Sequence, residues 1–147
     1  MELPLKNITV DNFSPFGKVL EMTPDGDDRF QIVITEEKEP WRLAVFRYRN
    51  HEINMLEAHP TTLESFEPLS GISVLLVAPP ENPNDLHAFL LDKPVCLYKN
   101  IWHQTLALTE EAQVKIAENL DVPGTQFHHL EHPLSVFLAD CFTKNRP

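Results

Sequence analysis

An acid and an imidazole stand two residues apart in the stretch 55–60, which reads Met-Leu-Glu-Ala-His-Pro. Because side chains alternate along an extended chain, we expect Glu57 and His59 to point to the same side of a sheet. A carboxylate and an imidazole on one face can share acid and base roles near neutral pH, or can bind a divalent metal ion together. The alternative is a structural role, because such a pair also occurs on ordinary sheet surfaces.

A second stretch, residues 98–104 (Tyr-Lys-Asn-Ile-Trp-His-Gln), supplies another imidazole, His103, beside Trp102. Extended geometry would place Lys99 on the same face as His103, unless Asn100 turns the chain. A Trp-His pair can also serve packing alone. The two stretches form a site if they face one cavity.

A third group, His128, His129 and His132, falls within five positions. A helix would bring His128 and His132 together at the spacing of a metal site. Pro133, and a Pro-Gly pair at 123–124, instead favour an exposed histidine-rich loop. We predict the loop.

Composition limits the partners of this chain. With 22 acidic against 12 basic residues, the formal charge of −10 argues against nucleic acid as a ligand. The same charge would repel a small anionic substrate unless cations gather at its site, so the positions of four basic residues are informative. They are Arg42, Arg47, Arg49 and Lys99.

Other motifs are missing from the sequence. It contains neither an apolar run of about 18 residues nor a secretory leader, so we expect a cytoplasmic protein without a membrane partner. Cys96 and Cys141 form no CxxC pair and are expected to be free thiols, with burial the favoured interpretation. A glycine-rich phosphate loop and a serine-nucleophile elbow are absent too.

Thirteen prolines and four glycines in 147 residues favour many short strands joined by turns. We predict a single domain, residues 1–147, folded as an all-β antiparallel barrel with one or two short helices. The helices are expected near 11–13 and within 82–90, and residues 112–120 fit either helix or strand. Strands are expected at 18–22, 29–35, 41–48, 52–59, 71–78, 95–98, 102–108 and 134–139. Residues 41–48 carry apolar side chains on both faces, which predicts cover on both sides.

Several short stretches, in this order and at this spacing, resemble the ureidoglycolate lyase family. They are 13–17 (Phe-Ser-Pro-Phe-Gly), 56–60 (Leu-Glu-Ala-His-Pro), 66–69 (Phe-Glu-Pro-Leu), 77–78 (Val-Ala), 88–89 (Ala-Phe) and 98–103 (Tyr-Lys-Asn-Ile-Trp-His). The resemblance implies a cupin-like barrel that forms homodimers. It also implies release of urea from ureidoglycolate, giving glyoxylate, in the recovery of nitrogen from purines through allantoin degradation. Two positions differ from the family pattern: Gln104 stands where a second histidine is usual, and Ala58 where an arginine often occurs.

That reaction needs a base for the substrate hydroxyl, an acid for the leaving nitrogen and a cation for the carboxylate. The resemblance implies that three residues share the acid, base or metal-ligand roles: Glu57, His59 and His103. It implies substrate contacts for five others: Lys99, Arg42, Arg47, Trp102 and Gln104. One divalent metal ion could replace several of these functions by chelating the substrate. The alternatives are a cupin-type barrel for another small polar acid or sugar derivative, and a dimeric binding module without catalysis.

Overall fold

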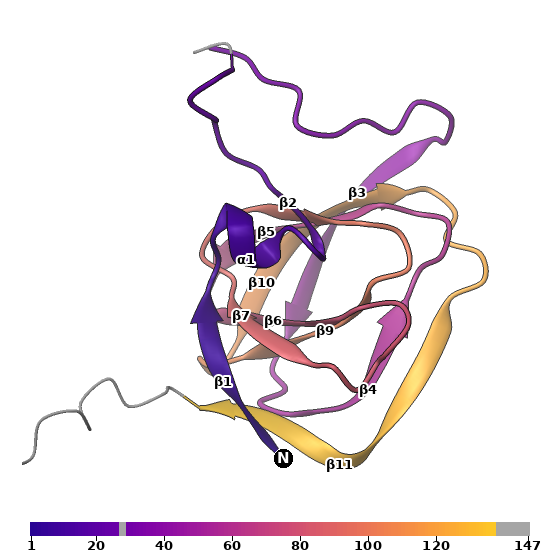
Figure 1. The fold of residues 1–147 in the computed structure, drawn as a ribbon. Coiled ribbons are helices and arrows are strands. Elements are labelled where there is room, and N and C mark those ends of the chain that lie inside the picture. Colours follow the sequence, from indigo (N-terminus) through magenta and orange to yellow (C-terminus); the bar gives the residue numbers. More distant parts are fainter. Residues whose placement is uncertain (27–28, 138–147) are drawn as a thin grey trace, which may run out of the picture.

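The computed structural model describes residues 1–26 and 29–137, and these residues form an all-β barrel with one short helix (Figure 1). The helix is α1 (Val10–Phe13). The strands are β1 (Glu2–Asn7), β2 (Gly17–Val19), β3 (Trp41–Tyr48), β4 (Ile53–Ala58), β5 (Glu64–Ser70), β6 (Ser73–Ala78), β7 (His87–Leu90), β8 (Val95–Leu97), β9 (Trp102–Ala107), β10 (Ala112–Asn119) and β11 (Gln126–Phe137). The predicted all-β class is confirmed. In the described part of the chain, no helix is long and apolar enough to cross a membrane.

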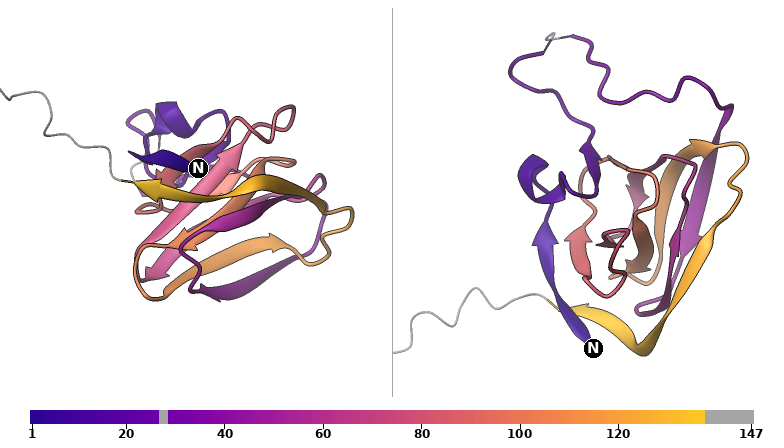
Figure 2. Two further views of the ribbon diagram at one scale, coloured as in Figure 1. Left: turned by 90° about the horizontal axis from the view of Figure 1, so that it is seen from below. Right: turned by 45° about the vertical axis from the view of Figure 1, so that its right-hand side comes forward.

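Two sheets make up the molecule. A five-stranded sheet has the order β2-β8-β5-β10-β3, and the remaining strands close into a ring in the order β1-β11-β4-β9-β6-β7. The neighbours are antiparallel except around β1, which runs parallel to both β11 and β7 and so closes the ring. Figure 2 shows β1 and β11, the two ends of the described chain, crossing on one side of the molecule.

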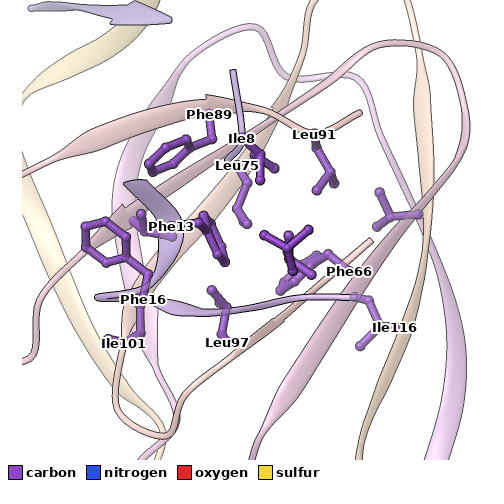
Figure 3. Packing of buried hydrophobic residues seen from close by; sticks show 14 of the residues in the cluster. Ile8, Phe13, Phe16, Phe66, Leu75, Phe89, Leu91, Leu97, Ile101 and Ile116 are labelled. Atoms are coloured by element: carbon purple, nitrogen blue, oxygen red, sulfur yellow. The ribbon is translucent and has the colours of Figure 1, made fainter. Parts of the chain in front are cut away.

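The space between the two sheets is filled at one end by aromatic and aliphatic side chains (Figure 3). Phe13 lies at the centre of this group, with its ring 5.2 Å from that of Phe89 and 6.1 Å from that of Phe16. Thr9 caps α1 in a reciprocal pair of hydrogen bonds with Asn12, which fixes the turn that delivers Phe13. The predicted short helix at 11–13 is confirmed.

A second apolar cluster lies inside the closed ring, on the other face of β4, β6 and β9. Its buried members are Ile53, Leu56, Val74, Leu76, Ala88, Leu106 and Leu134. Strand β6 is buried on both faces because it contributes to both clusters. The tightly packed ring of strands therefore fixes the positions of those residues of β4 and β9 that face the five-stranded sheet.

Several local predictions were wrong. Residues 82–90 form turns followed by strand β7 instead of a helix. Strand β7 pairs with β6, from His87 opposite Val77 to Leu90 opposite Val74. This pairing provides more backbone hydrogen bonds than an isolated turn of helix would. Residues 29–35 lie outside the sheets and have no strand assignment (Figure 1). Strand β3 was located correctly, but most of its side chains are exposed instead of covered on both sides. Residues 112–120, left open by their pattern, form strand β10.

The histidine group also differs from the prediction. His128 and His129 belong to strand β11 and not to a loop, because they pair with Leu56 and Met55 of β4. Cys96 is buried, as expected, whereas Cys141 lies outside the described residues. The last predicted strand, 134–139, falls within β11 as far as Phe137, and the rest of it is outside the described residues.

Candidate active site

The two stretches that carry Glu57, His59 and His103 meet on one side of the interior. Glu57 of β4 lies directly opposite His103 of β9 in the sheet register. His59 follows β4 at once, and its carbonyl oxygen accepts a hydrogen bond of 2.8 Å from the backbone N–H of Asn100. The rings of His59 and His103 meet edge to face, with centroids 5.1 Å apart. The structure therefore brings these three side chains together.

A fourth residue, Glu64, completes the group from the opposite sheet and was not singled out by its sequence. Its Oε2 lies 2.9 Å from Nε2 of His103 and 3.3 Å from Nε2 of His59. Oε1 of Glu57 is 3.9 Å from Nε2 of His103. Glu64, His59 and His103 are buried, whereas Glu57 is partly open to solvent.

Hydrogen bonds on the far side of each ring orient the imidazoles. Nδ1 of His103 is 2.9 Å from the carbonyl oxygen of Ile101, which can only accept, so Nδ1 carries a proton. Nδ1 of His59 is 3.0 Å from the Thr125 hydroxyl, whose own proton points to the Val122 carbonyl 3.2 Å away. Nδ1 of His59 therefore donates as well, and both Nε2 atoms point into the cluster.

The charges of this cluster are strongly coupled. Burial alone would raise the pKa of Glu64, but the charge of His103 and the close contacts of both imidazoles outweigh it and lower the pKa to about 2. Burial alone would lower the pKa of His103, but the neighbouring Glu64 carboxylate outweighs it and raises that pKa. Without a metal ion, each partner thus favours the charged form of the other, a carboxylate facing an imidazolium.

A row of charged residues extends from the cluster across the five-stranded sheet. Glu118 of β10 lies opposite Glu64 of β5 on one side and opposite Arg42 of β3 on the other. Arg42 donates to Oε1 of Glu118 from Nε at 3.0 Å and from Nη2 at 2.7 Å. This row and the residues Glu57 and His59 line an open cavity of about 460 Å³. A guanidinium, the imidazole of His59 and carboxylates thus line one solvent-accessible space, and His103 is buried next to them.

The other residues expected to contact substrate lie elsewhere. Lys99 forms an ion pair of 3.0 Å with Glu36, because Asn100 has a positive φ of 67° that breaks the alternation between Lys99 and His103. Arg47 pairs with Glu111 on the outer face of β3.

Trp102 and Gln104 flank His103 on the strand and therefore face the other way. The indole N–H of Trp102 donates to the Pro80 carbonyl. The indole packs against the apolar cluster enclosed by the closed ring of strands. Gln104 lines a separate hollow beside Asn54.

The cluster also has the chemistry of a metal site. Ligand atoms of Glu57, His59 and His103 lie within 4.8 Å of one another, and His59 forms a second such group with Glu64 and Glu118. Among the described residues, Nε2 of His103 and Oε2 of Glu64 are buried without a well-aligned hydrogen bond, although they are close. Neutral imidazoles whose Nδ1–H donates to a fixed acceptor present their Nε2 lone pairs in the way that metal-binding histidines do. The residues present therefore fit a divalent metal ion.

The fold and this cluster define a class, a small all-β barrel with an acid–imidazole site in an open interior cavity. Comparison with known proteins identifies the family within that class. The family described as ureidoglycolate lyase matches residues 31–136, and the chain belongs to this family.

Similar proteins include two curated relatives and one solved structure. A ureidoglycolate lyase from Agrobacterium fabrum is 28% identical over 143 residues, covering 83% of this chain and 86% of the relative. One from Rhizobium etli is 27% identical, with the same coverage. A TDP-quinovose 3,4-ketoisomerase from Campylobacter jejuni aligns with a TM-score of 0.48 at 14% identity, covering 73% of this chain and 87% of that one.

Proposed function

We propose that this protein is a ureidoglycolate lyase, which releases urea from ureidoglycolate and leaves glyoxylate. The observation that carries the proposal, beside family membership, is that Glu57, His59 and Arg42 line one cavity, with His103 close to Glu57 and His59. The substrate is a hydroxy acid whose carbon also bears the urea nitrogen. A base removes the hydroxyl proton, the C–N bond breaks as the C=O bond forms, and an acid protonates the leaving nitrogen.

The positions of the side chains suggest how the roles divide. Glu57 and His59 both line the cavity, so Glu57 serves as the base and His59 as the acid. His103 is buried behind them, and Glu64, at the wall of the cavity, contacts both imidazoles, so this pair holds the charge and orientation of the cluster. Arg42 holds the substrate carboxylate at the opposite wall, by sharing or exchanging its contact with Glu118.

A divalent metal ion would be held by Glu57, His59 and His103, with Glu64 as a further carboxylate. When bound, it would polarise the substrate oxygens as a Lewis acid. The residues that line the cavity then orient the substrate, so that the substrate carboxylate lies within reach of Arg42. Neutral imidazole is required for ligation, so protons compete with the metal at His59 and His103.

The wider setting follows from the same proposal. The protein acts on a small anionic substrate in the cytoplasm, in purine nitrogen recovery, and works as a homodimer. Because the chain has a formal charge of −10, a small anion needs a cation at its site, and Arg42 supplies one at this cavity, which His59 also lines.

The test is incubation of purified protein with ureidoglycolate, after EDTA treatment and after addition of Mg²⁺, Mn²⁺, Zn²⁺ or Ni²⁺. We expect glyoxylate and urea in equal amounts, under at least one of these conditions. The matched control is the Glu57→Gln protein, which loses the base without losing volume. No glyoxylate under any condition would overturn the proposal and favour a barrel for another small acid or sugar derivative, or a non-catalytic binding module.

A further inference from the structure

The cavity that carries the charged row is larger and more apolar than ureidoglycolate requires. Its volume of about 460 Å³ lies within the range of pockets that enclose drug-sized ligands, roughly 300–1,000 Å³. Among the described residues, half of those that line it are apolar: Ala44, Val45, Phe46, Ile116, Val122 and Phe127. Ureidoglycolate is a much smaller molecule and has no apolar group. The proposed reaction therefore leaves the apolar part of the cavity without a ligand.

The apolar residues follow the charged row along one face of the five-stranded sheet. Arg42 of β3 lies opposite Glu118 of β10, and the next pair on that face is Ala44 opposite Ile116. Phe46 comes next on β3, and all five residues line the cavity. Successive side chains on one face of a strand are about 6.7 Å apart. The face thus changes from charged to apolar within one step, and the single methyl group of Ala44 leaves room there.

Two exposed aromatic residues border the same cavity. Phe127 of β11 lies opposite Glu57 of β4 and is 57% exposed, and Phe46 is 43% exposed. Exposed apolar side chains gathered beside polar groups mark a ligand-binding groove, and aromatic rings offer a large contact area. We call the surface formed by Ala44, Phe46, Ile116 and Phe127 the apolar groove. It fits an apolar group on a ligand whose polar end lies at Glu57 and the charged row.

We propose that this protein also cleaves N-acyl-α-hydroxyglycines, and that the apolar groove binds their aliphatic acyl group. These compounds keep the carbon of ureidoglycolate that bears the hydroxyl, the carboxylate and the nitrogen. They differ only beyond the nitrogen, where an alkyl chain on the carbonyl replaces the amino group of the urea. The inference rests on the proposed lyase function, because it uses the same reacting atoms, and it extends that function to a class of larger substrates.

The reaction needs no residue or reactant beyond those of the proposed function. Glu57 takes the hydroxyl proton, the C=O bond of glyoxylate forms, the C–N bond breaks, and His59 protonates the leaving nitrogen. The products are glyoxylate and a primary carboxamide, which together contain all the atoms of the substrate. With the substrate carboxylate at Arg42, the acyl chain extends from the nitrogen over Ala44 toward Phe46.

A series of acyl chains tests the inference by glyoxylate release from N-acetyl-, N-butanoyl- and N-hexanoyl-α-hydroxyglycine, beside ureidoglycolate. We expect kcat/KM to rise about twofold for each added methylene, because a half-open groove buries part of each group. Turnover of ureidoglycolate alone, or equal kcat/KM values for all three chains, would overturn the inference and leave the proposed function standing. Turnover of the acyl series alone, rising with chain length, would support the groove and exclude ureidoglycolate as the substrate. No turnover at all would overturn both.

Substitution of Ala44 tests where the acyl chain lies. Ala44→Leu fills the groove, so the ratio of kcat/KM for the hexanoyl substrate to that for ureidoglycolate should fall at least about tenfold. Ala117→Leu is the matched control, because Ala117 lines a separate hollow beside Trp41 on the other face of the sheet, and it should keep the ratio. Phe46→Ser, at an exposed position, removes apolar contact without adding volume and should lower the ratio about fivefold. An unchanged ratio in Phe46→Ser, or in folded Ala44→Leu, would overturn the inference.

Discussion

The interior between the two sheets has two halves built from opposite chemistry, one closed to solvent and one that meets an open cavity. Around Phe13, which is fully buried, every neighbour in the cluster is apolar. Around His103, which is 3% exposed, the polar neighbours are Glu64, His59 and Glu57, and the ring of Phe66 packs against it from the apolar side. Burial of apolar surface stabilises a fold, whereas burial of charges costs free energy that their mutual attraction only partly returns. The polar half is therefore maintained for its chemistry, and the apolar half carries the stability that permits it.

Removing a large side chain from the apolar half should produce the largest change in stability. Phe13→Ala leaves a cavity among Phe16, Phe89 and Leu97, and should lower the free energy of unfolding by about 3–5 kcal/mol. The turnover per folded molecule should stay within about twofold, because Phe13 does not reach the cluster. Urea denaturation and glyoxylate release, measured on one preparation, check both parts. A large loss of turnover in fully folded protein would show that the halves are not separate.

The contribution of the polar half to the free energy of unfolding should depend on pH. Because the pKa of Glu64 is lowered in the folded protein, its carboxylate stabilises the fold at pH values above 4.5, the ordinary pKa of a glutamate. This contribution is lost as the pH falls toward 2. Because the pKa of His103 is raised in the folded protein, its imidazolium stabilises the fold at pH values below 6.5, the ordinary pKa of a histidine. This contribution is lost as the pH rises through the raised pKa. In metal-free protein, the pair should therefore contribute most between about pH 4.5 and 6.5.

The comparison is with Glu64→Gln, which cannot form the ion pair. The free energy of unfolding of the unmodified protein should exceed that of the variant by up to about 3 kcal/mol near pH 5.5, with a smaller difference near pH 3. Denaturation of both proteins in EDTA, near pH 5.5 and near pH 3, measures this difference in the free energy of unfolding. A difference that does not change with pH would mean that the carboxylate and imidazolium are not coupled.

Glu64→Gln should also impair chemistry more than any stability loss explains. The variant retains the shape of the side chain but removes the charge that orients both imidazoles, so turnover should fall about 100-fold. Glu67→Gln on the same strand is the control, because Glu67 pairs with exposed Lys115 and should change turnover less than about twofold. Equal rates for the two variants would assign Glu64 to structure alone.

The smallest expected effect separates two arginines of one strand. Arg42 lines the cavity, whereas Arg47 pairs with Glu111 away from it. Arg42→Ala should raise KM for ureidoglycolate about tenfold, and Arg47→Ala should leave it unchanged. Steady-state kinetics of the two variants provide the measurement. An increase in KM for Arg47→Ala alone would reverse the assignment.

Part of this arrangement could be predicted from local pattern. The alternation of side chains placed Glu57 and His59 together, because β4 is a regular strand and His59 follows it without a break. The same rule failed for Lys99 and His103, because Asn100 takes a left-handed conformation between them. Local signals thus succeed where the backbone stays regular.

The remaining differences depend on tertiary contacts. Glu64 could not be placed from its spacing, because it begins a strand of the opposite sheet and reaches the imidazoles only through the fold. The capped turn at 82–85 indicated a helix, but the edge of β6 was available and β7 paired with it. The apolar pattern of β3 predicted cover that is not supplied by the described residues of its own chain.

The most direct test of the polar half is the rate of glyoxylate release by Glu57→Gln, measured beside Glu52→Gln. Both substitutions remove one carboxylate near β4, but Glu52 is exposed at the far end of that strand. We expect a loss of at least about 100-fold for Glu57→Gln and an unchanged rate for Glu52→Gln. Full turnover by folded Glu57→Gln would contradict the assignment of the active site to this half of the barrel.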